Sequence, residues 1–245
     1  MKVVDYLSWL RNSPRIEPAE LLAGRPLLVI APHPDDESLG CGGLIAWASE
    51  QGVAITIVFL TQGERSHEGS HAFPSHALAR LRHDEAVSAA AQLGVTGERL
   101  HFLNLPDGGL GHMDDEALEA IHFSLLGVVA TELPPLICVT SRTDRHCDHQ
   151  AAWLIAQRLA KSCGATALGF PIWTWMLDPQ GDIAVPPRRA WRLATRNPAR
   201  KRSAIAAHRS QLGGVIDDAT TPFVIPEALL DIVCLHDEVF IDDRL

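Results

Sequence analysis

The sequence predicts an α/β fold with a mostly parallel sheet and helices on both of its faces. Short apolar runs alternate with longer segments of helical composition between residues 26 and 170. Glycine or proline follows most of these segments, as expected where strands and helices end. A repeated β-α-β-α order is typical of parallel sheets covered by helices. We therefore expect a doubly wound, Rossmann-like sheet followed by a C-terminal cap segment.

Each element of this fold has its own signal in the chain. Residues 1–25 are expected to form a short helical leader that ends at Gly24 and Pro26. Five apolar runs fit buried strands, over residues 27–31, 53–61, 100–103, 136–140 and 165–170. The segments between them favour helices, over residues 39–51, 77–93, 115–131 and 149–162. The remaining long segment, residues 62–76, is rich in Gly, Ser and His and predicts a loop that is a candidate lid.

The alternation ends after Pro171, where Trp and Pro residues interrupt the chain. A further helix is expected over residues 198–212, followed by a short apolar, partly extended tail. No flexible linker marks a boundary in this region. We therefore expect one domain over residues 1–245, with a leader (1–25), an α/β core (26–170) and a cap (171–245).

Composition excludes several classes of protein. The chain is 47% hydrophobic and 21% charged, and 245 residues can bury a core without disulfides. Its five Cys are scattered and form no CxxC pair, which favours reduced thiols in the cytoplasm. The longest stretch without a charged residue, residues 162–177, has 16 residues, too few to span a bilayer. We expect a cytoplasmic protein with no membrane partner and no secretory signal.

Basic residues are concentrated in one segment, although the formal charge of the whole chain is −9. This basic stripe is either a solvated face or a surface that meets an anionic part of a ligand. Trp191 is its one aromatic residue, so the stacking surface typical of single-strand binders is missing. We expect no nucleic-acid partner, and a homo-oligomer stays open. The stripe consists of Arg188, Arg189, Arg192, Arg196, Arg200, Lys201, Arg202 and Arg209.

Two clusters of histidine and acidic residues follow the first and the fourth predicted strand. Either cluster alone would fit a solvated turn or the start of a helix. Ligands of open parallel sheets bind at the carboxyl ends of the strands, so two clusters at that edge favour one functional site. The clusters contain His33, Asp35, Asp36, Glu37, Asp144, His146, Cys147, Asp148 and His149.

These donors suit a catalytic zinc ion, which takes three protein ligands and keeps one position for water. His33 and Asp36 are candidates for two ligands, and a histidine of the second cluster for the third. Asp35 is then the candidate general base for the water. The remaining histidine of the second cluster can hold a substrate oxygen, and Asp148 can orient an imidazole. Fe²⁺ or Co²⁺ would also fit such a site.

The two clusters resemble the motifs of the LmbE-like or PIG-L N-deacetylases. Residues 33–37 read His-Pro-Asp-Asp-Glu, as in the first motif of that family. Residues 146–149 are similar to its second motif, with Cys147 in place of Pro. Further similarity lies in residues 61–64, where Gln62 replaces the usual Asp, in Arg82 and Glu85, and in residues 201–211.

The resemblance implies hydrolysis of an N-acetyl amide on a small amino sugar or glycoconjugate, with a metal-bound water as nucleophile and free amine and acetate as products. It implies zinc ligands at three positions, His33, Asp36 and His149. Asp35 would be the general base. His146, helped by Asp148, would stabilise the oxyanion or protonate the leaving amine. Arg82 would lie near the sugar hydroxyls.

Three other residues are candidates for substrate binding, each with a simpler alternative. Asp107 could contact a sugar hydroxyl or form a turn. Trp173 could provide an apolar wall for a sugar ring or pack the cap. His208, on the same helical face as Gln211, could look into the cleft or lie on a polar surface.

Two other functions remain open at this stage. A metal-dependent phosphoesterase would use the same types of ligand, generally with a second metal ion and more bridging carboxylates. A non-catalytic, sugar-binding relative of the fold would not need a general base, so Asp35 argues against it.

Overall fold

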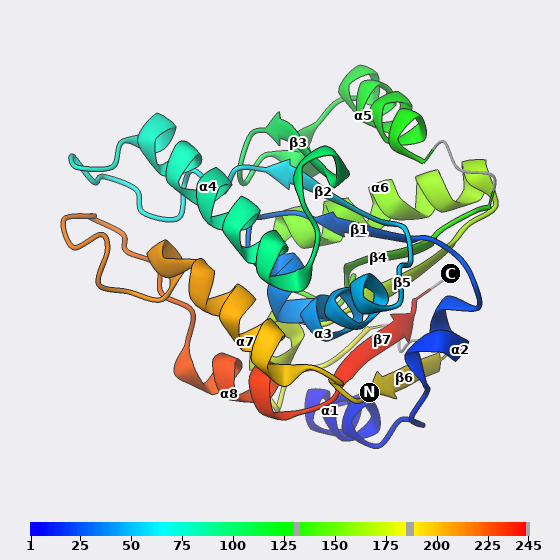
Figure 1. The fold of residues 1–245 in the computed structure, drawn as a ribbon. Coiled ribbons are helices and arrows are strands. Elements are labelled where there is room, and N and C mark those ends of the chain that lie inside the picture. The colour runs from blue at the N-terminus through cyan, green and yellow to red at the C-terminus, as the bar shows by residue number, and fades with distance from the viewer. Residues whose placement is uncertain (130–132, 185–188, 244–245) are drawn as a thin grey trace.

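The computed structural model describes residues 1–129, 133–184 and 189–243, and it has the expected α/β architecture (Figure 1). Two helices form the leader, α1 (Val3–Arg11) and α2 (Pro18–Leu22). None of the described helices combines the length and apolar character that crossing a bilayer requires.

The described strands form one seven-stranded sheet in the order β3-β2-β1-β4-β5-β7-β6. The pairs among β1 to β5 are parallel, whereas β7 pairs antiparallel with both β5 and β6. Because the chain moves from β1 outward to β3 and returns to β4, the sheet is doubly wound with its switch point between β1 and β4. The strands are β1 (Leu27–Ala31), β2 (Ile55–Thr61), β3 (Leu100–Leu105), β4 (Leu136–Thr140), β5 (Thr166–Phe170), β6 (Arg189–Leu193) and β7 (Glu238–Asp242).

Helices cover both faces of the sheet, as Figure 1 shows. Alternate residues of β1 point to opposite faces, so Val29 belongs to one buried cluster and Ile30 to the other. The Val29 face is covered by α3 (Asp36–Glu50), α4 (Ser75–Leu93), α7 (Pro198–Ala207) and α8 (Glu227–Leu235). The Ile30 face is covered by α5 (Asp115–Val128) and α6 (Cys147–Cys163).

The helices after β1 and β4 begin earlier than the sequence predicts. Helix α3 starts at Asp36 rather than residue 39, and α6 starts at Cys147 rather than residue 149. Their N-caps are Asp35 and His146. The polar clusters therefore lie at the starts of the helices, where unpaired backbone N–H groups favour acidic and polar side chains.

The C-terminal region differs most from the prediction. Strand β6 was not predicted, whereas β7 lies in the tail that was expected to be partly extended, and both strands extend the sheet. The helix expected over residues 198–212 ends at Ala207, and a 3₁₀ turn, η4 (Arg209–Gln211), follows His208. The predicted end of the helix over 115–131 falls partly outside the described residues.

The basic stripe is divided among ion pairs with different acidic residues. Lys201 is buried, and its Nζ lies 2.7 Å from Glu238 Oε1. Arg200 reaches Glu50 at 3.2 Å, and Arg196 pairs with Glu17. Arg188 lies outside the described residues. The described part of the stripe therefore forms one buried ion pair and several ion pairs at the surface. This arrangement favours a solvated face over a surface that meets an anionic part of a ligand.

Candidate active site

Two loops meet at the switch point of the sheet. One follows β1, carries His33 and Asp35, and leads into α3 at Asp36. The other follows β4, carries His146, and leads into α6, whose first turn contains His149. Strands β1 and β4 are hydrogen-bonded neighbours, so their carboxyl ends bring the two loops together. A cavity of about 400 Å³ opens at this point, and both loops contribute to its wall. Ligand cavities of doubly wound folds are expected at this position.

The first loop holds Asp35 in an unusual backbone conformation. Its φ of 130° and ψ of −27° lie outside the regions that L-residues normally adopt. The backbone N–H of Asp35 donates to Glu37 Oε2 at 3.0 Å. Arg82 donates to Asp35 Oδ2 at 3.2 Å and to the backbone carbonyl of Pro34 at 2.6 Å. Such strain persists only where neighbouring groups hold it, and it is common at functional sites.

The His33 ring has carboxylates on both of its edges. Its Nε2 lies 3.2 Å from Asp107 Oδ1 and 3.2 Å from Asp148 Oδ2. Its Nδ1 lies 3.3 Å from Asp36 Oδ2, the same oxygen that accepts the backbone N–H of His33 at 2.9 Å. Two carboxylates at Nε2 favour a proton there, so Nδ1, on the side of Asp36, is the ring nitrogen available to a metal ion.

The His149 ring is fixed in a similar way by Asp144. Its Nδ1 lies 2.9 Å from Asp144 Oδ2, so Nδ1 carries the proton. Its Nε2 is fully buried, lies 3.4 Å from Asp36 Oδ1 and has no hydrogen-bond partner among the described residues. A buried nitrogen lone pair beside a carboxylate is the arrangement expected of a metal ligand.

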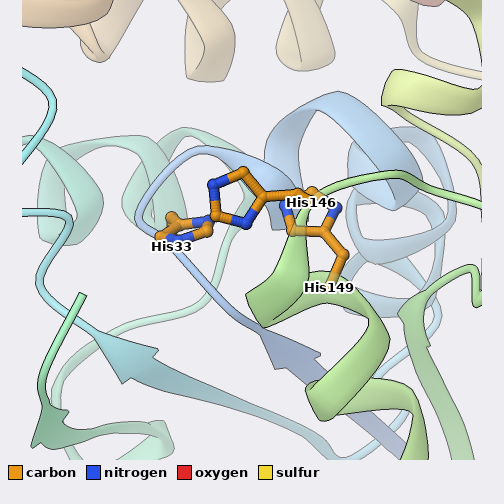
Figure 2. Close-up of side chains that lie close together, drawn as sticks. All are labelled: His33, His146 and His149. Atoms are coloured by element: carbon orange, nitrogen blue, oxygen red, sulfur yellow. The ribbon is translucent and has the colours of Figure 1, made fainter. Parts of the chain in front are cut away.

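The three histidines of the two loops converge, as Figure 2 shows. One ring nitrogen from each of His33, His146 and His149 lies within 4.8 Å of the others. With Asp36 between His33 and His149, these donors fit a metal ion that binds nitrogen and oxygen ligands. A second group of the same kind joins His33 to Asp107 and Asp148, on the opposite edge of the ring.

Burial and charge separate the acid–base properties of the neighbouring groups. Burial raises the pKa of Asp35 to about 6, although Arg82 opposes this rise. Burial alone would also raise the pKa of Asp36, but His149 and His33 lower it to about 2. Burial, with His33 and His149 beside it, lowers the pKa of His146 to about 4. Two adjacent carboxyl groups thus differ strongly in acidity, which is typical of sites with distinct acid–base roles.

Comparison with known proteins identifies the family. The sequence profile of the PIG-L family, described as GlcNAc-PI de-N-acetylase, matches residues 28–160, more than half of the chain. This chain is a member of the PIG-L family. The match includes both loops of the cavity.

Relatives in the PIG-L family include proteins named as deacetylases. A 1D-myo-inositol 2-acetamido-2-deoxy-alpha-D-glucopyranoside deacetylase of Streptomyces scabiei is 30% identical over 232 residues, which cover 80% of this chain and 68% of that protein. A probable N-acetyl-alpha-D-glucosaminyl L-malate deacetylase 2 of Bacillus subtilis is 33% identical over 129 residues, 51% of this chain and 56% of that protein. The match to a relative in Kineococcus radiotolerans, 37% identical, spans 39% of this chain and only 28% of that protein.

Solved structures share the fold of this PIG-L chain. The conserved protein TT1542 from Thermus thermophilus has a TM-score of 0.59 at 24% identity, with 90% of this chain and 96% of that chain covered. The N,N'-diacetylchitobiose deacetylase from Pyrococcus horikoshii has a TM-score of 0.58 at 20% identity, with 88% and 82% covered.

The PIG-L motif residues lie together: Asp148 contacts an imidazole, as expected from the sequence, and Arg82 contacts Asp35, which the sequence did not predict. The Asp148 carboxylate lies against His33 and accepts the backbone N–H groups of Gly108 and Leu110, while His146 Nδ1 accepts the backbone N–H of Asp148. The Arg82 guanidinium is buried against Asp35 and the carbonyls of Pro34 and Gly63. Both side chains therefore contact groups of the site.

Of the four candidates for substrate binding, three line the cavity: Arg82, Asp107 and Trp173. Asp107 also accepts the backbone N–H of Arg65 at 2.9 Å. Trp173 packs edge-to-face on Phe223, with 5.9 Å between ring centres. His208 is buried behind the loop after β1, and the described residues that line the cavity do not include it.

Two acidic residues have roles that the sequence analysis did not assign. Asp144 fixes His149, and Glu37 holds the backbone of Asp35. The available signal was their place inside the two clusters. Composition does not distinguish a residue that faces the cavity from one that supports its neighbours.

Proposed function

We propose that this protein is a metal-dependent amidohydrolase that removes the acetyl group from an N-acetylated amino sugar or a small glycoconjugate. The observation that carries the proposal is that His149 Nε2 is buried and has no hydrogen-bond partner among the described residues. It lies beside Asp36, whose carboxylate also contacts the His33 ring. The residue that precedes Asp36 in the chain is the strained Asp35. Ligands and an acidic residue with a raised pKa at one cavity are typical of hydrolytic sites.

Three residues would hold the metal: His33, Asp36 and His149. The proposed ion is Zn²⁺, and Fe²⁺ or Co²⁺ would suit the same donors. When bound, such an ion lowers the pKa of a water to about 7 and polarises a carbonyl group. Asp144 fixes one ligand, and Asp107 with Asp148 fixes another, as supporting carboxylates do at metal sites.

Asp35 is the proposed general base. It lines the cavity next to Asp36, and Arg82 fixes one of its oxygens. Asp35 accepts a proton from the attacking water as that water adds to the acetyl carbonyl carbon. The C–N bond then breaks, and the nitrogen leaves as the free amine after receiving a proton from Asp35 or His146. The products are acetate and the amine.

His146 is the proposed partner of the carbonyl oxygen. Its Nδ1 accepts the backbone N–H of Asp148 at 3.2 Å, so the neutral ring carries its proton on Nε2. This N–H can donate to the negative charge that develops on the oxygen. Loss of one such donor costs about 100- to 1000-fold in kcat in comparable sites.

The substrate class rests on the relatives and on the cavity. Several relatives are named as deacetylases of acetamido sugars. The cavity combines carboxylates and imidazoles with an apolar side made of Ile172, Trp173 and Phe223, which suits a sugar ring with one polar and one apolar face. A cytoplasmic location is part of the proposal, because all five cysteines are unpaired.

The test is release of acetate and free amine from a panel of N-acylated sugars, with and without a chelator, together with the metal content of the protein. His33→Ala should lose the metal and the activity. Asp35→Asn should keep the metal and lose turnover. His76→Ala, an exposed histidine at the start of α4, is the control and should keep both.

Other outcomes would support other functions. Two metal ions per chain, with release of phosphate from phosphate esters, would support the phosphoesterase. Binding of an N-acetyl sugar without hydrolysis would support a non-catalytic, sugar-binding protein.

A further inference from the structure

His208 lies where the helix predicted over 198–212 breaks. It is the C-cap of α7, with φ −81° and ψ 56°, and only 1% of its surface is exposed. Its Nε2 lies 3.1 Å from Glu37 Oε1 and 3.4 Å from Ser38 Oγ. The ring therefore inserts between α7 and the start of α3, behind the wall of the cavity.

Glu37 connects this histidine to Asp35. Its side chain is fully buried, and its two oxygens accept from different partners. Oε2 accepts the backbone N–H of Asp35 at 3.0 Å, and Oε1 accepts the hydroxyl of Ser38 at 2.6 Å. Because an ionised carboxylate only accepts hydrogen bonds, the His208 ring is the donor to Oε1. The bonds form one line from His208 through Glu37 to Asp35.

Asp35 depends on these bonds because its φ of 130° is unfavourable for a residue with a side chain. Arg82 holds its carboxylate, but Glu37 holds its backbone. If Glu37 were free to rotate, the peptide before Asp35 would lose its partner and could relax. The carboxylate would then move relative to His33 and Asp36.

We infer that His208 is a positioning residue that acts through Glu37 to hold Asp35 in its strained, reactive orientation. This inference rests on the proposed function, in which Asp35 is the general base. It changes the interpretation of His208, which then supports the base from behind the cavity instead of contacting the sugar.

The test compares two substitutions of His208 with a control in the same helix. His208→Leu removes the donor, and His208→Gln can keep an N–H near Glu37. Asn197→Ala is the control. It removes the N-cap of α7, at the opposite end of the helix from His208 and its contact with Glu37. For each protein, kcat, KM, metal content and melting temperature are measured, and the backbone of Asp35 is examined in a crystal structure.

We expect His208→Leu to lower kcat by about 10- to 100-fold, as displacement of a reacting group by about 1 Å does. Its KM and metal content should stay near those of the wild type, and Asp35 should leave its positive φ. His208→Gln should restore most of kcat, and Asn197→Ala should lower the melting temperature with kcat unchanged.

The inference is wrong if His208→Leu keeps both kcat and the conformation of Asp35, or if His208→Gln is as impaired as His208→Leu. It is also wrong if Asn197→Ala lowers kcat as much, since the effect would then be one of general stability. If the wild type hydrolyses no N-acyl sugar, the proposed function fails. The crystal structure then decides the positioning role alone, by whether Asp35 changes in His208→Leu and not in Asn197→Ala.

Discussion

At the scale of single residues, Asp144 shows how much of the site depends on side chains outside the cavity wall. It is completely buried. Its carboxylate accepts the backbone N–H groups of Ile172 and Thr174, the Thr174 hydroxyl and the His149 ring. These donors fix the direction of the carboxylate. It therefore determines which nitrogen of His149 is free to bind a metal ion.

Asp144→Asn should weaken zinc binding without removing a ligand. The amide keeps the shape of the side chain but loses the charge that favours the Nδ1–H form of His149. Supporting residues of this kind contribute about 10- to 100-fold to metal affinity. Competition with a chromogenic chelator measures the change. Asp178→Asn, at an exposed aspartate that does not line the cavity, is the control and should bind zinc like the wild type.

The sequence predicted which loops form the site but not which contacts its residues make. His33, Asp36 and His149 meet because the alternation of elements placed both loops at one edge of the sheet. The contact of His33 with Asp148 joins residues 115 positions apart, and that of His208 with Glu37 joins residues 171 positions apart. Such pairs depend on packing between elements, which the periodicity of a single sequence does not encode.

At the scale of elements, the loop between β2 and α4 is held against the C-terminal region. Arg65, Ser66 and Glu68 line the cavity from this loop. Glu68 forms an isolated β-bridge with Thr221. Asp218 accepts the Ser70 hydroxyl at 2.5 Å and the backbone N–H groups of residues 71 and 72 at 2.9 Å. These contacts attach the loop, which the sequence suggested as a candidate lid, to the C-terminal region beside the cavity.

We expect the attachment of this loop to depend on pH through His67. Its side chain is almost fully buried, and burial, together with the nearby Arg82 guanidinium, lowers its pKa. In the folded state the pKa of His67 lies below the ordinary value of about 6.5. The neutral ring therefore stabilises the folded loop fully above about pH 6.5, and this stabilisation is lost as the pH falls through the lower, folded pKa. Hydrogen bonds from Ser70 and neighbouring backbone groups lower the pKa of Asp218, so this anchor stays charged.

Amide protection at residues 71 and 72 should therefore fall as the pH is lowered below about 6.5. Hydrogen exchange, corrected for the intrinsic rate at each pH, measures it. His67→Gln removes the titrating group, and its protection should not change over this range. Equal pH dependence in both proteins would mean that another group controls the loop.

The elements that the sequence missed are those shaped by their neighbours. Strand β6 contains Arg189 and Arg192, and these charged residues interrupt the apolar pattern from which a strand is predicted. It forms because β7 pairs with it along five residue pairs. Helix α7 ends at Ala207 because the next residue, His208, turns inward to Glu37, a contact that helical periodicity cannot predict.

At the scale of the whole molecule, a buried ion pair within the C-terminal region also contacts helix α3 of the core. Lys201 of α7 and Glu238 of β7 are 2% and 1% exposed, and their charges lie 2.7 Å apart. Glu238 also accepts the backbone N–H groups of Gly43 and Leu44, just after the kink of α3 at Cys41. Helices α3 and α7 and strand β7 therefore share one polar contact inside the apolar cluster that covers β1.

This contact predicts that the described parts of the core and of the C-terminal region unfold as one unit. Lys201→Met leaves the Glu238 charge buried without its partner, which costs about 3–5 kcal/mol in comparable sites. Native-state hydrogen exchange should show the same loss of stability in β1 and in β6, because neither can keep its packing when the other unfolds. Arg196→Met, which breaks an exposed pair with Glu17, should change stability by only about 0–1 kcal/mol. A loss confined to β6 and β7 in Lys201→Met would instead indicate a separate C-terminal domain.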